Sequence, residues 1–169
     1  MKKNKGITLI SLIVTIILLL IIAGISIKGG ESVVKKAQLE EIRTNMLLIQ
    51  AKAREYVEKA NFKIGIKPTD EAKMGEYEEK KNKVREEIYV EEAKLQKATG
   101  MTLPTEINMT DDLYKVTEET LQEWGLSKIK AKPDEVYLIE FDDTNVTVEI
   151  YNTKGYKGNY SLTQIDKME

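Results

Sequence analysis

The feature that most constrains this chain is an apolar stretch, residues 7–27, that contains no charged residue and consists mostly of Ile, Leu and Val. Its length is close to the roughly 20 residues that a helix needs to cross a bilayer. Lys2, Lys3 and Lys5 precede it, and basic residues beside an apolar segment stay on the cytoplasmic side. We therefore expect a single-pass membrane protein with a cytoplasmic N-terminus and an extracytoplasmic domain over residues 28–169.

Two other kinds of N-terminal segment share this hydropathy. A conventional secretory signal has a shorter apolar region, roughly 7–15 residues, followed by a small-x-small cleavage site, which only Gly24-x-Ser26 matches weakly here. A lipoprotein anchor is excluded because the chain has no Cys. An uncleaved signal anchor fits the hydropathy equally well. From hydropathy alone, a secretory signal and a signal anchor therefore both remain possible.

The composition argues against catalysis. The chain has neither His nor Cys, which removes the usual zinc sites, thiol nucleophiles and the common general base. Adjacent acids occur at Glu118–Glu119 and Asp142–Asp143, but neighbours in a helix start or a turn do not face each other across a substrate. The net charge of -2 gives no support for nucleic-acid binding. We predict no enzyme, no cofactor and no metal.

The residues around the start of the apolar stretch are more specific. Gly6, Ile7, Thr8 and Leu9 follow the basic leader directly, and this arrangement resembles the N-terminus of type IV prepilins and pseudopilins. The resemblance implies that a prepilin peptidase cuts between Gly6 and Ile7, removing residues 1–6, and that the new amino group of Ile7 is methylated. A glycine suits such a site because a residue without Cβ fits an enzyme cleft closely.

Ser11 departs from the family pattern, which usually has Glu at this position. In the family, that Glu is thought to pair with the terminal ammonium of a neighbouring subunit, which offsets the cost of a charge among apolar helices. Ser11 supplies no charge. It indicates either a minor or specialised subunit or filaments without the pair, and a serine that bonds only its own backbone explains it as well.

An amphipathic helix is predicted after the apolar stretch. A stripe recurs at alternating spacings of three and four residues, which places its members on one helix face: Leu39, Ile42, Met46, Ile49, Ala53, Tyr56 and Ala60. Joined to residues 7–27, it gives one long helix with a transmembrane half and an amphipathic half. Gly24, Gly29 and Gly30 weaken this helix, each by up to about 1 kcal/mol relative to Ala, and predict a hinge.

The rest of the sequence predicts a second helix over 71–98, which Gly100 terminates, so that residues 31–100 are mainly helical. A short helix is expected over 117–125, with Thr117 as N-cap and Gly125 as left-handed terminator. Two alternating segments over 135–151 predict a β-hairpin. The fold class is α+β: a long N-terminal helix, a second helix and a small C-terminal antiparallel sheet, as in pilins.

These features predict a structural subunit, major or minor, of a type IV pilus-like or type II secretion-like filament, stored in the membrane and polymerised after leader cleavage. Its partners are then homologous or related pilin subunits, prepilin peptidase, the pilus assembly machinery and membrane lipid. The alternative is a monomeric, membrane-anchored extracytoplasmic binding or sensory domain. The sequence leaves open whether the filament serves as a pilus, a secretion pseudopilus or a DNA-uptake fibre.

Overall fold

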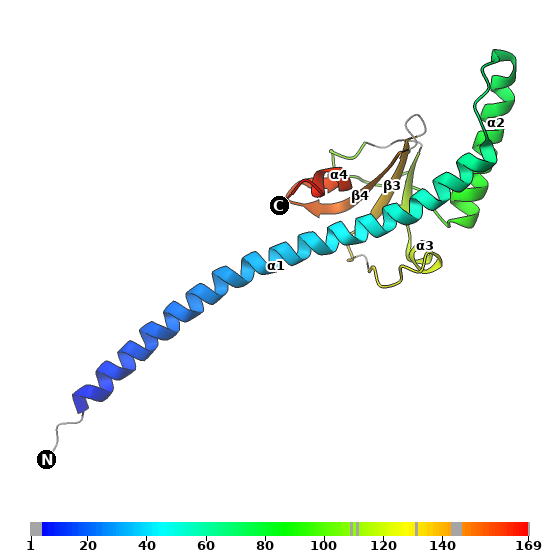
Figure 1. Ribbon diagram of the computed structural model, residues 1–169. Coiled ribbons are helices and arrows are strands. Elements are labelled where there is room, and N and C mark those ends of the chain that lie inside the picture. The colour runs from blue at the N-terminus through cyan, green and yellow to red at the C-terminus, as the bar shows by residue number, and fades with distance from the viewer. Residues whose placement is uncertain (1–4, 109, 111, 131, 143–146, 169) are drawn as a thin grey trace. The chain divides into compact units, whose positions relative to one another are not determined.

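The computed structural model describes residues 5–108, 110, 112–130, 132–142 and 147–168, with the side chains of residues 5–32 and 142 outside that description. The chain divides into two units, residues 1–40 and residues 41–169. Helix α1, Lys5–Ile64, begins in the first unit and ends in the second. The rest of the fold belongs to the second unit (Figure 1).

The part of α1 in the second unit buries the predicted stripe. Met46, Ile49, Ala53 and Ala60 are completely buried, whereas Tyr56 is half-buried. Gly65 follows the last helical residue, and its φ of +83° is favourable only for a residue without Cβ. Its N–H donates to the Asn61 carbonyl over 3.0 Å, which satisfies one of the free carbonyls at the helix end.

The second helical region is shorter than its sequence predicts. It comprises the 3₁₀ helix η1, Glu71–Lys73, the α-helix α2, Met74–Arg85, and the π-helix η2, Glu86–Glu92. The predicted helix end at residue 98 was wrong, because the helical region ends at Glu92, although residues 31–100 as a whole are mainly helical. Lys94 takes a φ of +57°, and the next residues form strand β1, Gln96–Lys97, because their backbone bonds to a neighbouring strand instead of continuing the helix.

A five-stranded antiparallel sheet follows, in the order β1-β2-β3-β4-β5. The remaining strands are β2, Leu113–Val116, β3, Tyr137–Asp142, β4, Thr147–Tyr156, and β5, Asn159–Ser161. The predicted mixed α+β class with an antiparallel sheet is therefore confirmed. β3 and β4 pair in the region where the alternating pattern predicted a hairpin.

Both faces of the sheet are covered. On one face, Ile139 of β3 pairs with Ile150 of β4, and α1 lies against this face: the Asn45 amide donates to the Tyr137 hydroxyl over 3.3 Å, and the Gln50 amide donates to the Val148 carbonyl over 2.9 Å. On the other face, a second apolar cluster forms beneath the loop that follows β1: Ala98, Ile107, Leu113 and Leu138. The sheet is therefore the central layer of the second unit.

Two short helices close the unit, and both carry capping boxes. Thr117 caps α3, Glu118–Glu123, through a 3.1 Å bond from the Thr120 N–H, as predicted. Gly125 ends it with a φ of +70°. Ser161 caps α4, Leu162–Ile165, in the same way. The Arg43 guanidinium of α1 donates to the Ile165 and Met168 carbonyls, over 3.1 and 2.5 Å, and holds the C-terminal segment on α1.

Candidate functional site

The most unusual surface in the second unit is the face of α1 opposite the buried stripe. Leu47 and Leu48 are each 44% exposed there. Thr44 and Ala51, one turn before and after, are exposed as well, and residues three or four apart lie on the same side of a helix. This face carries two large apolar side chains and no partner within the described residues. We call residues 44–51 on this side the outer face of α1.

The outer face was not predicted from the sequence, although a signal for it is present. The stripe predicted apolar residues only at Met46 and Ile49, yet the sequence between them is Leu47–Leu48. Met46, Leu47, Leu48 and Ile49 follow one another about 100° apart around the helix, so the four side chains cover more than one face and cannot all point into one core. Apolar residues in excess of the core stripe therefore indicate a second contact surface.

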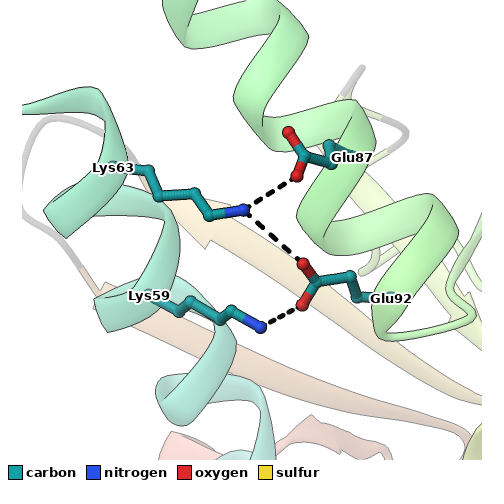
Figure 2. A network of polar contacts seen from close by, with 4 residues as sticks. All are labelled: Lys59, Lys63, Glu87 and Glu92. Carbon is teal, nitrogen blue, oxygen red and sulfur yellow. Dashed lines mark hydrogen bonds and ion pairs between the residues drawn. The ribbon is translucent and has the colours of Figure 1, made fainter.

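A network of ion pairs joins the end of α1 to η2. Figure 2 shows Lys59 and Lys63 of α1 reaching toward Glu87 and Glu92 of η2. The Lys63 ammonium lies 2.8 Å from the Glu87 carboxylate and 3.6 Å from that of Glu92, which also pairs with Lys59. The hydrogen bond from Lys59 lowers the pKa of Glu92, and the bond to Glu87 raises the pKa of Lys63. The network orients the second helical region on α1 rather than forming a reactive centre.

A groove of about 550 Å³ lies between the second helical region and the edge of the sheet. Its lining is polar and nearly balanced in charge: Asn82, Arg85, Glu86, Val90, Lys97, Asp112 and Tyr114. Burial and the nearby Asp112 carboxylate raise the pKa of Tyr114. The groove has the size of a small-molecule site and could accept a polar ligand. This groove was not predicted from the sequence, because its residues come from three separate segments.

Among the carboxylates of the second unit whose side chains the structure describes, Glu135 alone is buried. Glu135 is 6% exposed, and its oxygens accept hydrogen bonds from the Asn152 amide over 2.5 Å, the Tyr137 hydroxyl over 3.2 Å and the Lys132 N–H over 3.1 Å. Burial raises the pKa of the Tyr137 hydroxyl, which also accepts the bond from Asn45 of α1. This group therefore links the sheet to α1.

Trp124 is a packing residue of the second unit. Trp124 is 4% exposed and stacks on Tyr56 of α1 with ring centroids 5.4 Å apart, as expected of a packing residue. Glu118 and Glu119 are exposed in the first turn of α3. The Asp142 side chain and all of Asp143 lie outside the described residues. Within the part of the chain that is described, no group of His, Cys, Asp or Glu is arranged to hold a metal ion.

The N-terminal sites predicted from the sequence fall where side chains are not described: Gly6, Ile7, Ser11, Gly24, Gly29 and Gly30. The expected transmembrane segment, residues 7–27, lies there too. Within the described part of the chain, no helix is long and apolar enough to cross a membrane.

Comparison with known proteins gives no assignment. No family model matches the sequence, and no significant match was found among curated proteins or solved structures.

Proposed function

We propose that this chain is a structural subunit of a type IV pilus-like or type II secretion-like filament. The observation that carries the proposal is the N-terminal sequence, in which a basic leader ends in Gly6-Ile7-Thr8-Leu9 and the apolar residues 7–27 follow at once. Prepilin peptidase cuts between Gly6 and Ile7, and Ile7 is then methylated. Until assembly, the subunit stays in the membrane with its second unit on the extracytoplasmic side.

The outer face of α1 supports this function. A subunit whose helix packs only onto its own domain needs one apolar stripe, whereas a subunit in a helical bundle needs another for its neighbours. Leu47 and Leu48 provide such a surface. In the proposed filament, α1 is the long pilin-like helix, with Gly24, Gly29 and Gly30 as its hinge. Neighbouring subunits replace lipid around residues 7–27, so apolar area is not exposed to water during growth.

Head-to-tail addition of such subunits gives an open helical polymer, because the contact is not closed by symmetry. The proposal applies to major and minor subunits and to pili, secretion pseudopili and DNA-uptake filaments, which use similar subunits. Its partners are other pilin subunits, prepilin peptidase, the assembly machinery and membrane lipid.

The test is intact-mass and N-terminal analysis of the protein recovered from membranes of its native host. We expect a mass lacking Met1 to Gly6, with or without one methyl group on Ile7. Gly6→Ala should leave the leader attached, whereas Gly24→Ala, a matched change beyond the cleavage site, should not affect processing. An intact N-terminus, or a cut near Ser26, would remove the main support for the proposal.

The groove between the second helical region and the sheet edge favours one alternative, a monomeric membrane-anchored binding domain. That function predicts an uncut N-terminus and no polymer. The same mass analysis, combined with sedimentation of material sheared from the cell surface, separates the two.

A further inference from the structure

The groove between the second helical region and the sheet edge is lined by a buried tyrosine whose hydroxyl has no hydrogen-bond partner. Tyr114 is only 5% exposed, yet within the described residues its hydroxyl makes no hydrogen bond. Its ring packs against Tyr89 and Phe141, with centroids 5.9 and 5.4 Å away, and is fixed by them. Most buried polar groups in proteins have a hydrogen-bond partner. The Tyr114 hydroxyl is therefore a donor held in place for a ligand.

The groove places charges of both signs around this hydroxyl. Burial raises the pKa of Tyr114, the Asp112 and Glu86 carboxylates raise it further, and the Arg85 guanidinium lowers it, so these charges lie near the hydroxyl. Lys97 adds a second cation to the lining. No ion pair joins Lys97 to Asp112 or Glu86 in the part of the chain that the structure describes. A singly charged ligand would be repelled by the groups of its own sign, whereas a zwitterion pairs with both.

The register of the sheet sets three of these groups side by side. Lys97 of β1 lies directly opposite Tyr114 of β2, so their Cβ atoms are about 5 Å apart. Asp112 precedes Tyr114 by two residues, and its carbonyl accepts from the Phe141 N–H over 3.2 Å, which continues the pairing of β2 with β3. Residues two apart in a strand share a face. A cation, a hydroxyl and a carboxylate therefore lie together at this edge of the sheet.

The same register turns main-chain groups of β1 away from β2. The Ala98 N–H donates to the Leu113 carbonyl over 3.0 Å. Main-chain groups alternate in direction along a strand, so the N–H and C=O of Lys97 point to the open side of β1. β1 is the outermost strand of the sheet. Such edge groups pair with the main chain of an extended peptide, and this edge therefore favours a peptide over other zwitterions.

The helical wall of the groove has an uncommon backbone. η2 is a π-helix of seven residues, whereas π segments are usually single turns and are frequent at functional sites. It contributes Val90 to the groove, and this apolar side chain is 37% exposed. An apolar contact is therefore available next to the charged groups.

We propose that the groove binds a short peptide with both termini free. The peptide main chain bonds to the open side of β1 at Lys97. Its carboxylate is held by Arg85 and Lys97, its ammonium group is held by Glu86 and Asp112, and one of its carbonyls accepts from the Tyr114 hydroxyl. The site lies wholly within residues 82–114 and is independent of leader cleavage and polymerisation.

Trialanine and its blocked forms test the ligand class. The full-length chain in detergent is titrated by isothermal calorimetry with trialanine, N-acetyl-trialanine, trialanine amide and the doubly blocked peptide. We expect a Kd for trialanine of about 1 mM or lower. Each single block should weaken binding about two- to five-fold, because it removes one partly exposed ion pair. No binding of trialanine, or equal affinity for the free and doubly blocked peptides, would overturn the proposal.

Removal of one hydroxyl tests where the peptide binds. Tyr114→Phe keeps the ring and should weaken trialanine binding about three- to ten-fold, because one hydrogen bond is lost. Tyr160→Phe, the same change on β5 at the opposite edge of the sheet, is the matched control and should leave the affinity unchanged. Far-ultraviolet circular dichroism checks that both variants are folded. Unchanged affinity in Tyr114→Phe, or an equal loss in both variants, would contradict binding in this groove.

Charge removal tests the assignment of the two peptide ends. Asp112→Asn should reduce the difference in affinity between trialanine and its N-acetyl form, and Lys97→Gln should reduce the difference between trialanine and its amide. Glu79→Gln, at an exposed position of α2 outside the groove lining, is the control for loss of a carboxylate and should change neither difference. If both groove variants altered the same difference, the assigned contacts would be wrong.

The proposed function and the peptide site fail separately. An attached leader and the absence of filaments would contradict the filament subunit and leave the calorimetric results unaffected. Leader removal and normal filaments, with no binding of trialanine, would contradict only the peptide site.

Discussion

Replacing Asn152 by Ala should destabilise the second unit more than its small loss of side-chain volume suggests. Asn152 is fully buried in β4. Its amide nitrogen donates to the buried Glu135 carboxylate over 2.5 Å. Its amide oxygen accepts from the Lys154 and Gly155 N–H groups over 2.9 and 3.1 Å. Asn152→Ala therefore removes three hydrogen bonds and leaves a buried carboxylate with one donor fewer.

The expected loss follows from these contacts. A buried polar group left without its partner costs about 1–3 kcal/mol, and more when it is charged. Glu135 keeps two other donors, and Lys154 is exposed, so water can replace the bond that its N–H loses, whereas the Gly155 N–H is buried. We therefore expect a total near 3 kcal/mol, which corresponds to a decrease in Tm of about 10 °C.

Trp124 provides the assay. It is the only tryptophan, it is buried, and it stacks on Tyr56 of α1, so its fluorescence reports separation of α3 from the helix. Thermal unfolding of the full chain in detergent is followed by this fluorescence and by far-ultraviolet circular dichroism. Asn108→Ala, at an exposed position, is the control. A Tm decrease for Asn152→Ala of less than about 3 °C would refute the reasoning, since it corresponds to at most about 1 kcal/mol.

Asn152→Asp refines the same prediction by keeping the shape and adding a charge beside Glu135. Repulsion raises the pKa of the introduced carboxyl above its unfolded value of about 3.9. The extra destabilisation is then full near pH 7 and disappears as the pH falls below that unfolded value. A loss of stability equal to that of Asn152→Ala at every pH would show that charge plays no part.

Gly155→Ala should lower the free energy of unfolding by about 3 kcal/mol or more, since the residue has a left-handed conformation and the added Cβ would lie 2.5 Å from the Asn159 carbonyl oxygen. Gly158→Ala, with open space around it, should cost only about 1–2 kcal/mol. Equal losses of stability in thermal unfolding would contradict this difference. Burial raises the pKa of Tyr89 to about 12. The neutral hydroxyl therefore contributes its full stability to the folded state below pH ~10, and this contribution is lost as the pH rises toward 12. Ultraviolet difference titration should show this late ionisation disappear in Tyr89→Phe. The pKa of Glu92 is lowered in the folded state, so its carboxylate stabilises the fold above its unfolded pKa of about 4.3, and this contribution is lost as the pH falls through the folded pKa. Glu92→Gln should therefore make Tm depend less on pH on the acid side. An unchanged acid slope would argue against this contribution.

The features that the sequence predicted correctly depend on neighbours along the chain. The stripe of α1 is set by helical periodicity, and the ends of α3 are set by Thr117 and Gly125. The Leu126 N–H donates to the Leu121 carbonyl over 2.7 Å, which closes the predicted C-terminal turn. The alternating segments around residues 137–152 likewise specify strands before any tertiary contact is known.

Other features were decided by partners distant in sequence. Residues 96–97 form a strand only because β2 offers a bonding edge, with Lys97 opposite Tyr114, and this pairing overrides the charged helical pattern that precedes them. Glu135 is buried because Asn152 and Tyr137 arrive from the same sheet.

For this protein, the sequence by itself determined the α+β class, the stripe of α1 and the ends of α3, because periodicity and capping act within a few residues. Only the tertiary structure decided that Leu47 and Leu48 stay exposed and that a groove opens beside Tyr114. Whether an apolar side chain is buried depends on which segment covers it, and that segment comes from elsewhere in the chain.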